Sequence, residues 1–162
     1  MPAGLAAHEY FMSKALEEAK LALEHNDVPI GAVIVSKNQV VAKGHNHVEK
    51  FADSTAHAEL LTIKSALKNI GYKHLLDSTM YVTLEPCSMC AGAIVLARIK
   101  TLVFGAKDIK AGACGSVLNL VQTQELNHRV KLVEGVLEKE CSELITGFFK
   151  DLRSKKKNDQ NN

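Results

Sequence analysis

The sequence contains no tryptophan, only three prolines and 10 glycines, and no long hydrophobic run. Because 46% of its residues are hydrophobic, this low proline and glycine content excludes a collagen-like, low-complexity or disordered chain. The longest uncharged apolar runs, such as residues 28–35, are well short of the roughly 20 residues that cross a membrane as a helix. Residues 1–5 also lack the basic region that begins a signal peptide. We therefore expect a soluble, cytoplasmic protein that contacts no membrane.

Cysteine is also scarce. Four cysteines in 162 residues are too few for a small secreted domain held together by disulfides. Two of them, Cys87 and Cys90, have a spacing that occurs in metal sites and in redox pairs. The length suits a single domain. We assign residues 1–153 to this domain and expect residues 154–162 to form a basic, polar and disordered tail.

The net charge is only +2, and it is unevenly distributed. Four of the 20 basic residues but only one of the 18 acidic residues follow residue 152, so residues 1–152 carry a net charge of −1. A nearly neutral body does not attract nucleic acid through a global field, so any RNA affinity must come from local clusters. The candidates are Lys107 and Lys110, His128-Arg129, and residues 150–157. The lysines at the chain end are equally typical of a solvated terminus.

Apolar residues recur along the chain at helical spacing in some segments and form extended runs in others. Residues 8–25 predict a helix, and two β-rich runs at 29–35 and 39–42 predict a hairpin. The remaining predicted elements are a helix from residue 56, a strand at 79–84, a helix at 87–97, strands at 101–106 and within 128–136, and a helix at 139–153. Strands separated by helices indicate an α/β sandwich with helices on both faces of the sheet.

Two short motifs carry residues suited to metal chemistry: His57-Ala58-Glu59 and Pro86-Cys87-Ser88-Met89-Cys90. Cys87 and Cys90 lie three positions apart at the start of a predicted helix, so both sulfurs project from one face. At that end the helix dipole favours thiolate over thiol. His57, at the start of the preceding helix, can add an imidazole to the two thiolates. Three protein ligands leave the fourth tetrahedral position to water, which is typical of a catalytic zinc.

Glu59 lies two residues from His57 and offers a hard oxygen beside soft sulfurs. It is better suited to move protons than to bind the metal. It can take a proton from the water that zinc activates and pass it to a substrate nitrogen. Such a site suits attack by water on an electron-poor amidine carbon, with ammonia as the leaving group.

Each motif alone is also consistent with a different chemical use. A single C-x-x-C pair can hold a structural zinc or act as a redox couple, and H-x-E is common by chance. A closed structural site needs a fourth cysteine or histidine, but Cys114 and Cys141 lack any paired spacing. A redox pair would leave His57 and Glu59 without a role. The two motifs together therefore favour a catalytic zinc.

H-x-E followed by P-C-x-x-C is typical of the zinc deaminases that act on nucleobases. From about residue 8 to residue 153, the chain resembles the bacterial tRNA-specific adenosine deaminase family. The matching segments are residues 27–33, 44–46, 55–59, 84–93, 103–108 and 127–130. The resemblance implies a cytidine deaminase-like fold, a three-layer α/β/α sandwich with a mixed five-stranded central sheet. It also implies a homodimer with one zinc ion (Zn2+) per subunit, which converts the wobble adenosine in the anticodon stem-loop of an arginine tRNA to inosine.

The same resemblance assigns roles to individual residues. It implies that His57, Cys87 and Cys90 bind zinc and that Glu59 is the catalytic proton shuttle. It also implies that Asn46 hydrogen-bonds the target base and that Asp108 contacts the sugar beside the flipped nucleotide. A carboxylate can accept a hydrogen bond from the ribose 2′-OH, which DNA lacks. From the residues alone, Asn46 is equally consistent with a turn and Asp108 with a solvated loop.

Two other functions remain open at this point. The metal motif is shared with zinc deaminases of small molecules such as guanine, cytosine or a free nucleoside, and residues 103–108 and 127–130 distinguish the tRNA enzymes from these. The second open function is that of a zinc-stabilised RNA-binding module without enzymatic activity. Glu59 argues against such a module, since a structural zinc needs no proton shuttle.

Overall fold

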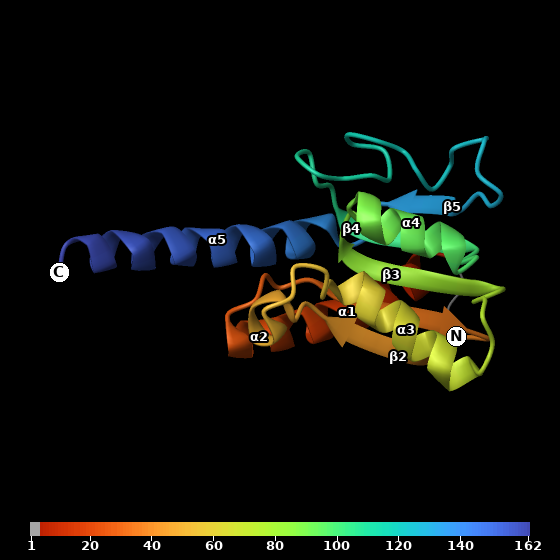
Figure 1. The fold of residues 1–162 in the computed structure, drawn as a ribbon, viewed down its shortest axis with the longest axis horizontal. Helices are drawn as coiled ribbons and strands as arrows, with labels where there is room; N and C mark the ends of the chain where they lie inside the picture. Colours follow the sequence, from red (N-terminus) through yellow and green to blue (C-terminus); the bar gives the residue numbers. More distant parts are fainter. Residues whose placement is uncertain (1–3) are drawn as a thin grey trace.

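The structure is a computed structural model that describes residues 4–162. Figure 1 shows the elements in chain order. They are α1 (Leu5–Leu21), the 3-10 helix η1 (Ala22–His25), β1 (Gly31–Ser36), β2 (Gln39–His45), α2 (Val48–Phe51), α3 (Ala58–Ile70), β3 (Ser78–Leu84), α4 (Ser88–Leu96), β4 (Thr101–Ala106), β5 (Lys131–Glu134) and α5 (Glu138–Gln160). No helix within residues 4–162 is both long and apolar enough to span a bilayer.

The five strands form one mixed sheet in the order β2-β1-β3-β4-β5. β1 is antiparallel to both β2 and β3, whereas β3, β4 and β5 run parallel. A two-residue turn, Lys37-Asn38, joins β1 to β2, and both residues have positive φ, at 51° and 61°. Such a turn matches the right-handed twist of paired strands, and Asn tolerates this conformation well. The predicted mixed five-stranded sheet is confirmed.

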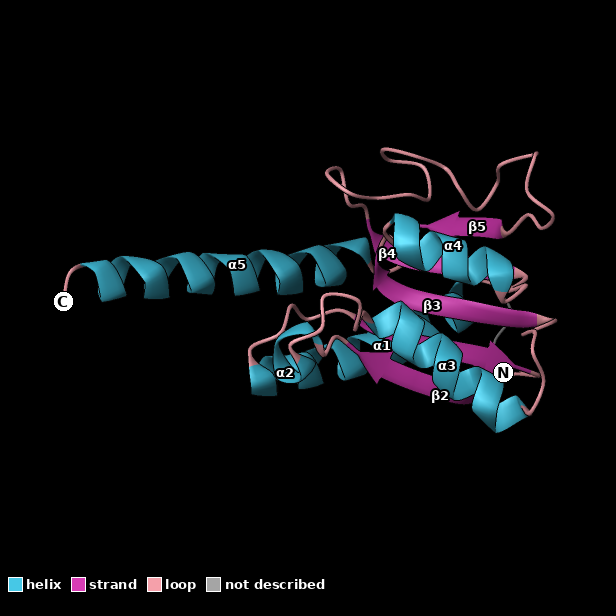
Figure 2. Cartoon of the chain, viewed as in Figure 1, coloured by secondary structure: helices cyan, strands magenta, loops and turns pink. Residues whose placement is uncertain are grey.

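Helices cover the sheet on both faces, as Figure 2 shows. Alternate residues of β1 point to opposite sides, as the two-residue period of a strand requires. Ala32 and Ile34 join the core beneath α3 and α4. Val33 and Val35 join the core formed with α1 and the start of α5. This arrangement confirms the predicted three-layer sandwich.

Three of the helices differ from the prediction. α1 begins at Leu5 and gives way at Ala22 to η1, where Asn26 in the left-handed conformation ends the helix. The four-residue helix α2 was not predicted, because it is too short to show a helical period. The prediction ends the last helix at residue 153, but α5 continues to Gln160.

The long α5 also corrects the disordered tail predicted for residues 154–162. Lysine and glutamine favour helix, and no glycine or proline interrupts the sequence after Gly147. The helix therefore has no stop signal before Gln160. Residues 149–162 are all exposed, and Figure 1 shows this part of α5 projecting away from the sheet.

The parallel pairing of β3 with β4 determines where the loops that carry chemistry begin. Leu84 and Ala106, at the ends of the two strands, are register partners. The segments that follow therefore leave the sheet at one edge. Asn46 lies at the same edge, because its backbone N–H donates to the carbonyl of Ile30, just before β1.

Candidate active site

His57, Cys87 and Cys90 come together where two helices begin. His57 is the N-cap of α3, Cys87 is the N-cap of α4, and Cys90 lies in the first turn of α4. Both N-cap residues have extended backbone, at ψ 148° and 175°, which turns the chain into the helix. Since α3 and α4 pack against each other, their N-termini meet at one site. Both helix dipoles favour negative charge there.

The three ligand atoms have the spacing that a zinc ion requires. The Nδ1 atom of His57 lies 3.6 Å from the Sγ atom of Cys87 and 3.6 Å from that of Cys90. Zinc bonds of about 2.3 Å to sulfur and about 2.1 Å to nitrogen, at a tetrahedral angle, place such atoms about 3.6 Å apart. The donor set, two soft sulfurs and an imidazole, also suits zinc. The group is therefore a possible metal site with an open fourth position.

Hydrogen bonds within this group shift the pKa values of all three residues. Those from Cys90 and His57 lower the pKa of the Cys87 thiol to about 3, despite its partial burial. The contact with Cys87 raises the pKa of His57 above its ordinary value. The pKa of the Cys90 thiol is raised, first because it donates to Cys87 and then because it is buried. At neutral pH the group thus already contains one thiolate.

Glu59 lies one residue inside α3, on the buried side of the helix. Burial raises the pKa of its carboxyl group, against the opposing effects of a backbone N–H and of His57. A carboxyl group whose pKa is raised towards neutrality can both accept and release a proton. Glu59 is therefore suited to proton transfer beside the metal group.

Asn46 is buried and accepts a hydrogen bond from the start of α3. The backbone N–H of Ala58 donates to its Oδ1 atom over 2.8 Å. Because an N–H must meet an oxygen, this contact also fixes the orientation of the side-chain amide. Its NH2 group makes no protein hydrogen bond within residues 4–162. Asn46 thus caps the helix that presents His57 and retains two free donors.

Asp108 follows β4 on a loop at the same sheet edge and is partly buried. Its Oδ1 atom accepts hydrogen bonds from the backbone N–H groups of Lys110 and Ala111, each over 3.1 Å. These hydrogen bonds stabilise the loop, which agrees with the loop position that the sequence also allowed for Asp108. The second carboxylate oxygen has no hydrogen bond from the described residues.

Sequence reasoning missed Glu85, a buried carboxylate that joins the two loops of the site. It precedes Pro86-Cys87 and accepts backbone hydrogen bonds from Asp108, Cys114 and Ser116, and one from the hydroxyl of Ser116. A Cβ at Gly112 would lie within 2.3 Å of its Oε2 atom. Glu85 therefore holds residues 108–116 against the segment that carries the cysteines. The available signal was an acidic residue directly after a strand that is otherwise uncharged.

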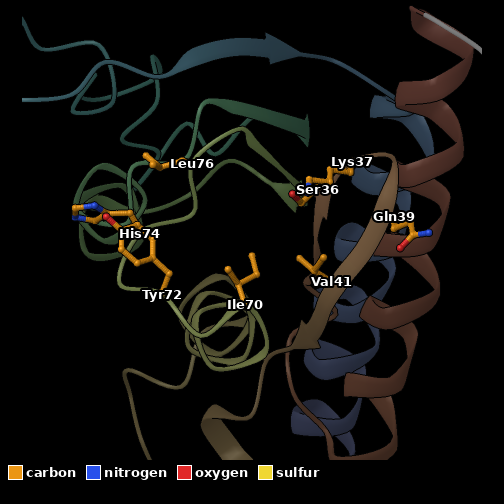
Figure 3. Close-up of a pocket in the computed structure, with 8 residues that line it drawn as sticks. All are labelled: Ser36, Lys37, Gln39, Val41, Ile70, Tyr72, His74 and Leu76. Carbon is orange, nitrogen blue, oxygen red and sulfur yellow. The ribbon is translucent and has the colours of Figure 1, made fainter.

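A separate hollow of about 370 Å³ lies at the other end of α3 (Figure 3). Ile70, Tyr72 and His74 line it together with the β1–β2 hairpin. None of the predicted site residues lines it. It therefore plays no part in the site described here.

Comparison with known proteins places this site in a family. The model of the MafB19-like deaminase family matches residues 6–153. The tRNA-specific adenosine deaminase of Bacillus subtilis strain 168 is 49% identical over 149 residues, which are 92% of each chain. The enzyme of the same name from Aquifex aeolicus is 49% identical over 90% of this chain and 96% of its own. This chain belongs to the tRNA-specific adenosine deaminase family.

A solved structure supports the membership in this deaminase family. It comes from a study of A-to-I editing by tRNA:A34 deaminases at the wobble position of transfer RNA. It superposes with a TM-score of 0.80 at 41% identity, over 83% of this chain and 98% of that one. The predicted family and the predicted cytidine deaminase-like fold are both confirmed.

Proposed function

We propose that this protein deaminates the wobble adenosine of a tRNA anticodon, most readily that of an arginine tRNA, to give inosine and ammonia. One observation carries the proposal. A histidine and two cysteines converge at two helix N-termini beside a buried glutamate, in a chain whose relatives are named tRNA-specific adenosine deaminases. This combination favours hydrolysis over redox or purely structural use of the cysteines.

The catalytic metal in this proposal is one zinc ion per subunit, held by His57, Cys87 and Cys90. The ligand spacing and the softness of the thiolates support this choice. When bound, zinc supplies a Lewis acid that activates a water molecule. Cys87, with its strongly lowered pKa, needs to lose no proton to bind the ion at neutral pH.

Glu59 is the catalytic residue of the proposal. Its carboxylate takes a proton as the water oxygen bonds to C6 of adenine, and it then delivers a proton to the exocyclic nitrogen. The C–N bond breaks, ammonia leaves and the ring becomes hypoxanthine, so the overall reaction consumes one water. Burial keeps bulk water from exchanging with this carboxyl group.

Asn46 and Asp108 bind the substrate in this proposal. The free NH2 group of Asn46 donates to an acceptor on the flipped base, while its oxygen stays on Ala58. The free carboxylate oxygen of Asp108 accepts a hydrogen bond from the ribose 2′-OH. Base flipping is required because the reacting carbon is inaccessible within a stack.

The proposal extends to assembly and location. We propose a homodimer of a single deaminase domain, residues 1–153, that acts in the cytoplasm, where tRNA is decoded. Large apolar side chains exposed on α4 and on the loop after β4 support a protein contact. They are Leu96, Ile109, Val117 and Leu118.

The test is incubation of zinc-loaded protein with an arginine tRNA anticodon stem-loop that carries adenosine at the wobble position, followed by nucleoside analysis. We expect inosine with the wild type and a rate at least about 100-fold lower with Glu59→Gln, because the proton shuttle is lost. Glu125→Gln, at an exposed position, is the matched control and should keep the wild-type rate. Ammonia released from guanine or cytosine, without inosine in the RNA, would contradict the proposed substrate.

A further inference from the structure

A second cluster of metal-ligating side chains lies outside the site described above. His25 ends η1, His45 ends β2, and His47 is the N-cap of α2. One ring nitrogen of each lies within 4.8 Å of those of the other two. The rings are inclined by about 30°, and their centroids are 4.3 to 5.3 Å apart. Two stretches that are 20 positions apart in sequence, the end of η1 and the junction of β2 with α2, thus bring three imidazoles together.

Each ring is oriented by a hydrogen bond through its Nδ1 atom. The acceptors are a carboxylate oxygen of Asp27 at 2.5 Å for His25, a carboxylate oxygen of Glu18 at 2.9 Å for His45, and the backbone carbonyl of His45 at 2.8 Å for His47. Carboxylates and carbonyls accept hydrogen bonds, so each Nδ1 carries the proton. The Nε2 atom of each ring is therefore the nitrogen that is available to a ligand.

The Nε2 atom of His25 is buried and has no hydrogen-bond partner among the described residues. A proton on this nitrogen would be a buried donor without an acceptor, and an unprotonated nitrogen would be a buried lone pair without a donor. Either state is costly. A metal ion satisfies the lone pair and removes the cost.

The surroundings carry the charge that a cation needs. Asp27 and Glu18 are both buried, so two carboxylates stand directly behind the rings. A histidine that ligates a metal almost always donates its other nitrogen to a carboxylate or a backbone carbonyl. All three rings have such an acceptor. The arrangement is thus that of metal-binding histidines with their supporting acceptors.

We propose that His25, His45 and His47 form a second metal site, which binds a borderline divalent ion such as zinc through three Nε2 atoms. Imidazole suits zinc, copper and nickel, whereas magnesium and calcium prefer oxygen. The site shares no ligand with the group formed by His57, Cys87 and Cys90. A metal ion at this site connects η1 to residues 45–47. Asn46 lies in this segment, between the two ligands His45 and His47. The proposal does not depend on the deaminase activity.

The first experiment measures zinc content by mass spectrometry in protein without a histidine tag, after zinc loading and desalting. We expect two zinc ions per chain in the wild type and one in His25→Gln and in His47→Gln. Cys87→Ser should also retain one, at the histidine site. His74→Gln, at a histidine outside both groups, is the matched control and should retain two. Circular dichroism checks that each variant is folded.

A single zinc ion in the wild type would overturn the proposal. So would a second ion that survives both His25→Gln and His47→Gln. Wild-type protein that binds two zinc ions but does not deaminate the RNA stem-loop would instead contradict the proposed function. The two failures are therefore distinguishable.

Cobalt distinguishes the two sites by their ligands. In folded Cys87→Ser protein, Co2+ at three histidines should give visible ligand-field bands without the strong thiolate-to-cobalt charge transfer of a two-cysteine site. Glu18→Gln keeps all three ligands, and we expect it to weaken Co2+ binding by about 10- to 100-fold, because the carboxylate behind His45 is lost. Unchanged affinity in this variant would overturn the assignment of Nε2 as the ligand atom.

Discussion

Asn46 and Asp108 each use one side-chain atom to shape the site and leave another free. The oxygen of Asn46 caps α3, and one oxygen of Asp108 closes the turn towards Ala111. In both cases hydrogen bonds from backbone N–H groups fix the side chain but use only one of its two polar atoms. A polar residue held in this way loses little conformational freedom when it binds a substrate.

Asp108→Asn separates these two uses. Asparagine keeps the oxygen that accepts from Lys110 and Ala111, so the turn survives, but the free oxygen becomes an NH2 group that cannot accept from a 2′-OH. We expect kcat/KM for an RNA stem-loop to fall by about 10- to 100-fold, the value of a hydrogen bond to a charged group. A matched DNA stem-loop should lose little, and zinc content should not change.

Asp53→Asn is the control for this experiment. Asp53 also accepts a backbone hydrogen bond two residues on, from Thr55, but it lies in a different loop and is exposed. Asp53→Asn should therefore leave kcat/KM unchanged for both the RNA and the DNA stem-loop. Equal losses on RNA and DNA in Asp108→Asn would remove the sugar contact from the mechanism.

At the scale of elements, α1 packs closely against β1 at Gly31. A Cβ on Gly31 would lie 2.1 Å from the carbonyl oxygen of Ala15 and 2.4 Å from the backbone nitrogen of Ala19. Backbone atoms of a helix cannot yield as a flexible side chain can. Glycine at this position therefore sets the distance between the helix and the strand.

Gly31→Ala should lower the free energy of unfolding by at least about 1–3 kcal/mol, because α1 must move away from the sheet. Gly147→Ala provides the contrast, since a Cβ there would contact nothing within 4 Å and Gly147 lies inside α5. It should raise the free energy of unfolding by about 0.5–1 kcal/mol. Urea unfolding of both variants measures these changes. A Gly31→Ala protein as stable as the wild type would contradict the close packing.

The strands were predictable because their signal is local. β3 and β4 are buried on both faces, so each appears as a run rich in apolar and β-branched residues that contains no charge, and the predicted bounds agree with the structure within one residue. Helix ends were less predictable. α5 has no stop residue to mark its end, and α2, with four residues, is too short for apolar residues to recur at helical spacing.

The site was predictable to the extent that its residues are adjacent in sequence. Cys87 and Cys90 share a helix start, and Glu59 follows His57 by two positions, so spacing alone identifies them. Glu85 was missed because its partner Ser116 is 31 positions away. The three histidines of the second site were missed for the same reason, since only the fold brings His25 at the end of η1 to His45 and His47.

For the molecule as a whole, a buried tyrosine and a buried cysteine determine how the free energy of unfolding changes at alkaline pH. Burial raises the pKa of Tyr81 to about 12 and the pKa of the Cys141 thiol to about 12. In the unfolded chain such groups ionise near pH 8.5 to 10. The folded state thus favours their neutral forms, and this contribution is complete below the unfolded pKa values. It is lost progressively between about pH 9 and about pH 12.

We therefore expect the urea midpoint to decline from about pH 9 upwards, and Tyr81→Phe to decline less steeply. Tyr81→Phe also loses the hydrogen bond with His8, so the slope with pH, rather than the midpoint at neutral pH, is the informative quantity. Tyr72→Phe, at a half-exposed position, should follow the wild type. Identical slopes for Tyr81→Phe and wild type would exclude Tyr81 as a source of the decline.

The projecting end of α5 gives the molecule a basic arm beyond an otherwise nearly neutral body. Replacing Lys155, Lys156 and Lys157 by glutamine removes three charges but keeps a helix former at each position. Each phosphate contact that is lost should reduce the slope of log K against log salt by about 0.7 to 0.9, so we expect a shallower slope by up to about 2 to 3 for a tRNA stem-loop. Turnover at saturating RNA should persist, since residues 149–162 are exposed and contribute nothing to the core. Lys37, Lys43 and Lys73, changed together, are the control with equal charge loss on the body. An unchanged slope in the α5 variant would make the arm a solvated chain end without RNA contacts.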